Sequence, residues 1–201
     1  MDVFENSKSA GKPWQIFAAS VVMGPQIPIN FDNMSEYAPA VAAPSIKAYT
    51  DAVLADDGAF ILRAGVAMDV TNISYNSDSF DGFSYEREML INGFVEKANN
   101  PIVLGGDSHE SWAYTLYEAG AIEGNPAAVN LGCPAVTAPG FWGAFLSDVL
   151  KPLSEALGGM DNVYKLASDT FVGRNSGLKY NDIHRKGFVA VKATKVRRKL
   201  V

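Results

Sequence analysis

Apolar runs separated by glycine or proline predict strands at several points along the chain. Residues 14–23, 102–104 and 127–131 are almost wholly apolar, and a Gly or Pro follows each run. Short uninterrupted apolar runs of this kind are typical of strands buried on both faces of a sheet. Residues 187–193, rich in Phe, Val and Ala, predict a further strand near the carboxyl end.

Helical periodicity separates these runs. Residues 84–98 place apolar side chains near one face and charged ones elsewhere, and an Asn-Asn-Pro sequence ends the pattern. Residues 46–55 and 145–157 predict two more helices, whereas residues 73–82, rich in Asn, Ser and Asp, predict an irregular loop. The alternation indicates an α/β fold, with no internal repeat and no linker.

Composition and charge narrow the classes of partner. The chain has 17 basic and 22 acidic residues, a net charge of -5, so no general attraction to nucleic acid or anionic membranes is expected. The one basic cluster is a solvated tail or a local contact site, and it consists of Lys195, Arg197, Arg198 and Lys199. No apolar run is long enough to span a membrane. Asp2 and Glu5 occupy positions where a signal peptide carries basic residues, so no signal peptide is expected.

Two reactive residue types occur in positions that favour ordinary structural roles. Cys133, the single cysteine, lies in an apolar stretch before a proline, which favours a small buried residue over a metal ligand or nucleophile. His184 lies in a polar turn, which favours a surface residue over a catalytic one.

Asp107 and His109 form the most promising chemical pair in the sequence. They follow the predicted strand 102–104 and two glycines, and open α/β sheets bind ligands at the carboxyl ends of strands. A carboxylate and an imidazole suit a hard or borderline metal ion, or an acid/base couple. Spacing alone equally allows a helix start in which Asp107 or Ser108 is the cap and His109 is merely exposed.

The neighbourhood of this pair resembles a signature of the PhoD-like alkaline phosphatases, members of the calcineurin-like metallophosphoesterases. That signature is a strand, then Gly-Asp-x-His, then Ser-Trp-Ala, and residues 100–113 follow it. Other segments resemble the family in the same order, namely residues 14–23, 78–87, 135–140 and 175–188. The resemblance covers most of this chain but only the latter part of the family's domain.

This resemblance implies a layered α/β/β/α sandwich with mixed sheets, of which residues 1–201 would be one partial, carboxyl-terminal domain. It implies that Asp107 and His109 bind metal and that Asp81 and Phe83 lie near the substrate. The family is known for an iron and calcium site, so two metal ions are expected in the complete domain. The implied reaction is metal-dependent hydrolysis of a phosphate-ester small molecule, in a periplasmic or secreted protein.

Departures from the family pattern limit that expectation. The family's earlier metal motifs, Asp-x-x-Tyr and Asp-Asp-His-Glu, have no counterpart here, and Ser20 and Ser176-Gly177 replace the usual Gln and Pro-His. One Asp and one His cannot hold two ions that each need several ligands. We therefore expect a fragment with little activity of its own, or alternatively a non-catalytic remnant that binds or supports another molecule. A third alternative is an unrelated α/β hydrolase. The sequence gives it no support, because it contains no Gly-x-Ser-x-Gly elbow.

Overall fold

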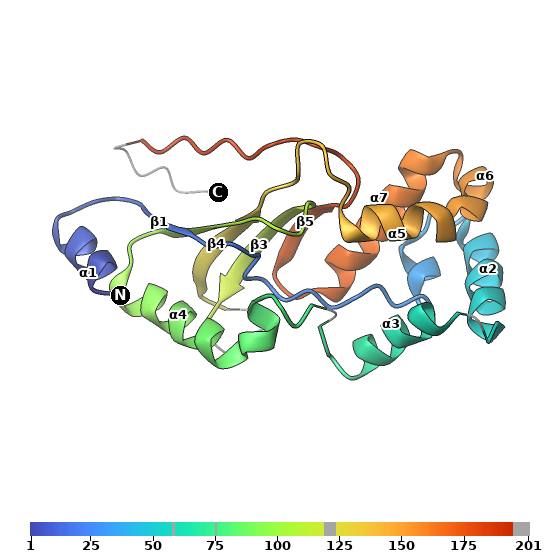
Figure 1. Cartoon of the computed structure of the whole chain (residues 1–201), viewed down its shortest axis with the longest axis horizontal. Helices are drawn as coiled ribbons and strands as arrows, with labels where there is room; N and C mark the ends of the chain where they lie inside the picture. The colour runs from blue at the N-terminus through green and yellow to red at the C-terminus, as the bar shows by residue number, and fades with distance from the viewer. Residues whose placement is uncertain (58, 75, 119–123, 195–201) are drawn as a thin grey trace.

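The computed structural model describes residues 1–57, 59–74, 76–118 and 124–194, and a five-stranded mixed sheet forms its centre (Figure 1). The strands are β1 (Gln15–Ala18), β2 (Pro101–Gly105), β3 (Ser111–Tyr117), β4 (Pro126–Gly132) and β5 (Leu178–Asp182). Their spatial order is β1-β2-β4-β3-β5. Strands β1, β2 and β4 are parallel, whereas β3 runs antiparallel to β4 and β5. The predicted α/β class with a mixed sheet is confirmed.

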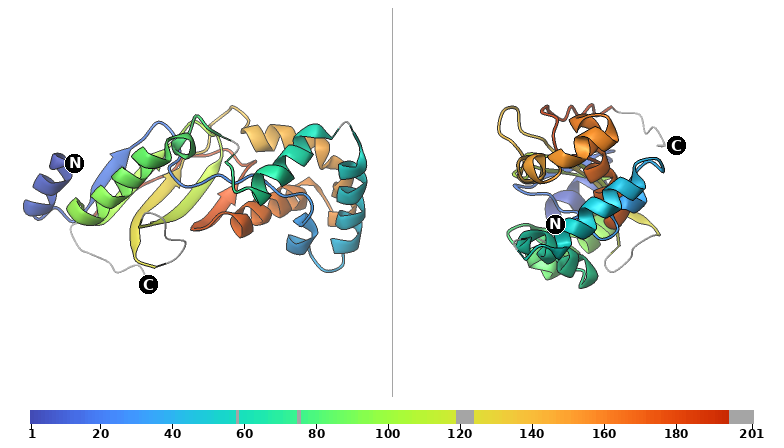
Figure 2. Two further views of the ribbon diagram at one scale, coloured as in Figure 1. Left: turned by 90° about the horizontal axis from the view of Figure 1, so that it is seen from below. Right: turned by 90° about the vertical axis from the view of Figure 1, so that its right-hand side faces the viewer.

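Helices flank this sheet and extend the molecule to one side. The α-helices are α1 (Asp2–Ser9), α2 (Ala43–Ala55), α3 (Phe60–Val70), α4 (Ser84–Lys97), α5 (Phe141–Val149), α6 (Ser154–Leu157) and α7 (Met160–Arg174). Short 3-10 helices in the described ranges are η1 (Met34–Tyr37), η2 (Phe80–Phe83) and η3 (Lys151–Leu153). Helices α2, α3, α5, α6 and α7 gather at one end of the molecule, while α1 and α4 lie at the other (Figure 2).

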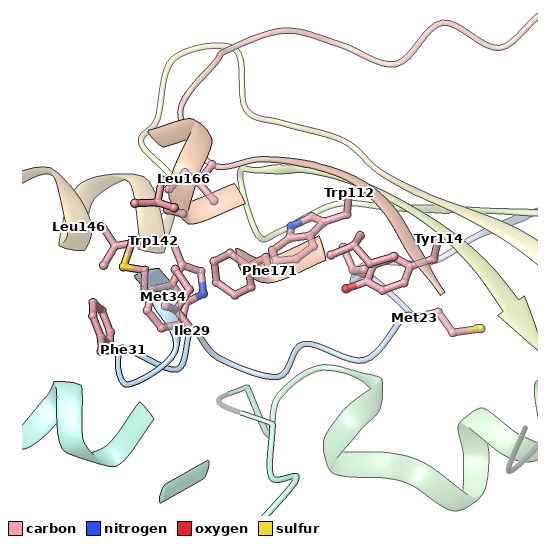
Figure 3. Close-up of a cluster of buried hydrophobic side chains, with 14 of the residues drawn as sticks. Met23, Ile29, Phe31, Met34, Trp112, Tyr114, Trp142, Leu146, Leu166 and Phe171 are labelled. Atoms are coloured by element: carbon pink, nitrogen blue, oxygen red, sulfur yellow. The ribbon is translucent and has the colours of Figure 1, made fainter. Parts of the chain in front are cut away.

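One face of the sheet is covered by α4 and α7 and forms the core. The strand register places Phe17, Val103 and Tyr114 on this face. Phe94 of α4 packs edge-on against Phe17 at a ring distance of 5.7 Å. Phe171 of α7 packs edge-on against Trp112 at 5.4 Å, at the centre of the buried cluster in Figure 3.

The opposite face of the sheet is apolar but less completely covered. It carries partly exposed side chains at Ile16, Ile102, Leu104, Val129 and Leu131. The extended segment 187–194 runs along this side, away from α4, and Trp14 Nε1 donates to the Thr194 oxygen at 3.0 Å (Figure 1). Parallel strands normally have both faces covered, so this face differs from the usual arrangement.

Several predicted elements are confirmed. The helix predicted at 84–98 is α4, the helix predicted at 46–55 lies within α2, and the strands predicted at 102–104 and 127–131 are β2 and β4. The strand predicted at 14–23 is only partly right, because β1 ends at Ala18. It is also an edge strand in which Ile16 is 48% exposed, so burial on both faces was a wrong prediction.

Other predictions fail for identifiable reasons. Residues 187–193 form no strand, since this segment crosses above the sheet instead of joining its edge. The helix predicted at 145–157 is divided into α5, η3 and α6, because Pro152 has no backbone N–H for a continuous helix. The basic cluster at 195–199 lies outside the described residues. None of the helices described combines the length and apolar character that a membrane span requires.

Candidate functional site

The loop of residues 105–109 follows β2 at the carboxyl end of the parallel strands. Its first residue is tightly enclosed, since a Cβ atom on Gly105 would lie 2.6 Å from the backbone oxygen of Val21. Cys133, directly after β4, donates its backbone N–H to the Gly105 oxygen at 2.9 Å. Glycine is therefore required at this position, and the loop is fixed to the chain on both sides.

Asp107 and His109 adopt a backbone conformation that is unusual for residues with side chains. Their φ angles are 67° and 60°, in the left-handed region, and both residues are exposed. Between them, the Ser108 hydroxyl accepts a hydrogen bond from Trp112 Nε1 at 3.0 Å. Such backbone strain in non-glycine residues concentrates at functional sites. The loop holds two polar side chains out toward solvent at an energetic cost.

The helix-start alternative for this loop is wrong. The segment after it is strand β3, so neither Asp107 nor Ser108 caps a helix. Trp112, Tyr114 and Leu116 are buried in alternation along β3. This two-residue period was the sequence signal that could have identified the strand.

His109 is held in one orientation by the segment 135–139. Its Nδ1 lies 3.0 Å from the Pro139 oxygen, and its own backbone oxygen accepts a hydrogen bond from Ala135 N at 3.3 Å. Because a carbonyl oxygen can only accept, Nδ1 carries the proton of this hydrogen bond. The Nε2 lone pair of the neutral ring is then available, as in histidines that bind metal through one nitrogen and donate from the other.

The number of metal donors in this loop is small. In the described parts of the chain, no three His, Cys, Asp or Glu side chains lie together in a group that could hold a metal ion. The Asp107 carboxylate and His109 Nε2 suit a hard or borderline cation chemically. They fit part of a metal site, since Ca²⁺ alone takes about six to eight oxygen ligands. The acid/base alternative for the pair stays open.

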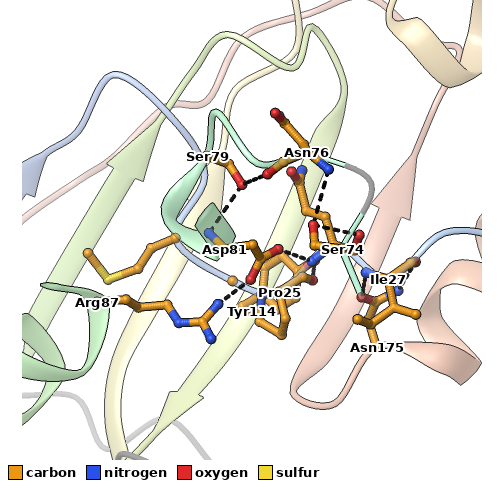
Figure 4. Close-up of polar contacts among 12 residues, drawn as sticks. Pro25, Ile27, Ser74, Asn76, Ser79, Asp81, Arg87, Tyr114 and Asn175 are labelled. Carbon is orange, nitrogen blue, oxygen red and sulfur yellow. Dashed lines mark hydrogen bonds and ion pairs between the residues drawn. The ribbon is translucent and has the colours of Figure 1, made fainter. Parts of the chain in front are cut away.

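Asp81 and Phe83 both lie in η2, directly before α4, and their surroundings differ. The Asp81 carboxylate is almost wholly buried: one oxygen accepts from Gln26 N at 2.8 Å and the other pairs with the Arg87 guanidinium (Figure 4). Phe83 is 55% exposed. No hydrogen bond or ion pair joins either residue to Asp107 or His109 within the described ranges. The contacts of Asp81 fix its own segment, η2, to residue 26. A role of Asp81 or Phe83 in substrate binding stays a prediction.

Glu110 is a residue that the sequence reasoning missed. It is fully buried, and its Oε1 accepts a hydrogen bond from Trp142 N at 2.7 Å. Burial raises the pKa of this carboxyl group to about 8, against the opposing effect of hydrogen bonds from the Trp142 and Gly143 backbones. Glu110 is therefore protonated at neutral pH. Nothing in the local sequence distinguishes it from a solvated glutamate, because its burial depends on α5.

His184 and Cys133 lie elsewhere around the same end of the sheet. His184 is exposed, as predicted, and its ring stacks on Tyr164 at 4.0 Å beside a groove of about 500 Å³ between α7 and β5. Cys133 is only partly buried and contacts the Pro134 oxygen through its thiol at 3.5 Å. Neither residue joins Asp107 and His109 in a metal-binding group in the part of the chain that the structure describes.

Comparison with known proteins connects these features to one family. Alkaline phosphatase D of Bacillus subtilis (strain 168) is 48% identical over 44 residues, which cover 21% of this chain and 8% of that protein. A solved structure of PhoD aligns with 92% of this chain and 24% of its own, at 16% identity and a TM-score of 0.47. The chain thus spans about a quarter of that relative's length. The model of the PhoD-like phosphatase family matches residues 2–200, and this chain therefore belongs to that family.

Proposed function

We propose that the loop 105–109 is the metal-binding part of a phosphoesterase, with Asp107 and His109 as ligands. The observation that carries this proposal is the pairing of an exposed carboxylate with an imidazole whose Nε2 is left free by the Pro139 contact. Membership of the PhoD-like phosphatase family supports the reaction class, hydrolysis of phosphate esters. Following that family, the proposed metals are iron and calcium.

The loop's own contribution is orientation. The strained backbone at residues 107 and 109 and the hydrogen bond to Pro139 hold both donors outward before any ion arrives. A bound cation would supply charge neutralisation for the phosphate oxygens and an activated oxygen nucleophile. Asp81 and Phe83 are proposed near the substrate on the family resemblance alone. Asp81 would act by fixing η2 to the segment around residue 26.

We further propose that residues 1–201 represent the carboxyl-terminal part of a larger domain of the family. The partly exposed apolar face of the sheet supports this, because a second sheet packed there would complete an α/β/β/α sandwich. The small donor count at the loop supports it as well, since the remaining ligands would come from outside the described residues. A periplasmic or secreted location is proposed with it, on family membership alone.

Metal binding by the isolated chain tests the central proposal. Calorimetric titration with Fe²⁺ or Ca²⁺ should give binding that is lost in Asp107→Ala and His109→Ala. Asp148→Ala, which removes an exposed carboxylate on α5, and His184→Ala are matched controls and should bind as the unaltered chain does. Equal affinity in all variants would refute the assignment.

Hydrolysis of p-nitrophenyl phosphate separates an enzyme from a non-catalytic remnant. A rate that requires added iron and calcium and disappears in Asp107→Ala supports catalysis by this chain. Metal binding without hydrolysis supports a site that is completed elsewhere. The absence of both supports the alternative, a binding or structural domain.

A further inference from the structure

Glu110 has an unusual position for a buried acidic residue, directly after His109 and against the amino end of α5. The helix begins after Gly140, which has no side chain to accept hydrogen bonds from the first turn. Glu110 supplies that acceptor from another part of the chain, through Oε1 to Trp142 N at 2.7 Å and a further hydrogen bond from the Gly143 backbone. It thus caps α5 from a distance of about thirty residues in sequence.

The junction between Glu110 and α5 is closely packed. A Cβ atom on Gly140 would lie 2.3 Å from Glu110 Cγ and 2.6 Å from Oε1. The side chain of Glu110 therefore occupies the space that any other residue at position 140 would need. The distance between the start of α5 and the loop 105–109 is set by this contact.

The same junction also includes the hydrogen bond of the His109 ring. Pro139, the residue before Gly140, provides the carbonyl oxygen that accepts from His109 Nδ1 at 3.0 Å. The adjacent residues 109 and 110 of one segment therefore contact the adjacent residues 139 and 140 of another segment. Withdrawing Glu110 would release α5 and the Pro139 oxygen together.

We propose that Glu110 is a positioning residue that fixes the ring orientation and tautomer of His109 through the start of α5. By holding Pro139 against Nδ1, it keeps the proton on that nitrogen and the Nε2 lone pair directed outward. The inference that this serves metal binding rests on the proposed function, whereas the link between Glu110 and the His109 ring does not.

Imidazole nitrogen NMR of the metal-free chain tests the link directly. The chain has two histidines, so ¹⁵N-labelled protein gives two ring systems, which His109→Asn assigns. The neutral ring of His109 should be in the Nδ1–H form. Glu110→Ala should convert it to the mixture of tautomers of a free ring, while Glu110→Gln, which keeps an oxygen for Trp142 N, should retain the Nδ1–H form.

Controls separate positioning from general loss of stability. Val163→Ala removes two methyl groups from a fully buried position on α7 and should destabilise the chain without changing the His109 signals. His184 serves as the internal reference, since its ring stacks on Tyr164 instead of contacting this junction. Should Glu110→Ala fail to fold, Glu110→Asp takes its place, because its carboxylate is one methylene further from Trp142 N.

Iron titration then links the orientation to binding. The Fe²⁺ affinity of the folded Glu110 variant should be about 10- to 100-fold weaker, and Glu110→Gln should restore it. An unchanged Nδ1–H form in the folded variant would overturn the proposal. If the unaltered chain binds no Fe²⁺, the proposed function fails, but the tautomer comparison still decides the role of Glu110.

Discussion

The contact between Asp69 of α3 and Arg174 of α7 provides a demanding test of how the helical end of the molecule is held together. The Asp69 side chain is 2% exposed. Both of its oxygens lie within 2.6–2.8 Å of the Arg174 guanidinium nitrogens, and Asn30 Nδ2 donates to one of them at 2.6 Å. Arg174→Ala leaves a buried carboxylate with the amide of Asn30 as its remaining partner in this group.

The expected cost follows from the burial of the carboxylate. Removing one member of a buried ion pair destabilises a protein by about 3–5 kcal/mol, because the other charge stays desolvated and uncompensated. For a chain of 201 residues, each kcal/mol lowers the melting temperature by about 2–4 °C. Arg174→Ala should therefore melt about 6–20 °C lower. Asp69→Asn in the same chain should recover part of this loss, since no buried charge remains.

Urea unfolding followed by tryptophan fluorescence measures the effect, because Trp112 and Trp142 are both buried. The matched control is Lys165→Ala, which breaks the exposed Lys165–Asp169 pair on the same helix. That pair should contribute about 0.3–0.5 kcal/mol. A cost for Arg174→Ala no greater than the cost for Lys165→Ala would refute the claim that burial makes this contact important.

Two further substitutions test how the loop 105–109 and the segment that follows β1 are supported. Gly105→Ala, whose Cβ would lie 2.6 Å from the Val21 oxygen, should cost about 1–3 kcal/mol in urea unfolding and weaken Fe²⁺ binding. Gly106→Ala, whose Cβ would have an ordinary 3.5 Å contact, is the control, and equal effects of the two would contradict the packing explanation. Asn130→Ala should cost about 2–5 kcal/mol, because two buried backbone N–H groups, at residues 23 and 24, lose their acceptor. A cost below 1 kcal/mol would show that these groups find other partners.

Local sequence patterns were sufficient to predict several strands and one helix from their own residues. Strands β2 and β4 are continuous apolar runs in the middle of the sheet. Helix α4 has the predicted extent, but Tyr85, Met89 and Val95 are exposed, and Ile91 and Phe94 are the large apolar side chains that it buries. The sequence also located the loop 105–109, because a strand followed by glycines and polar residues is a local feature. Family resemblance supplied the proposed roles of Asp107 and His109, which local spacing left undecided.

Tertiary structure alone decided the features that depend on distant contacts. The run 14–23 has the composition of a central strand, but β1 ends at Ala18. At residues 23 and 24 the backbone N–H groups donate to the Asn130 side chain and not to a neighbouring strand. Glu110 resembles any surface glutamate in sequence, yet α5 buries it completely. The free nitrogen of His109 likewise depends on a carbonyl oxygen thirty residues away. Periodicity reports only the neighbours along the chain, whereas burial and protonation are set by neighbours in space.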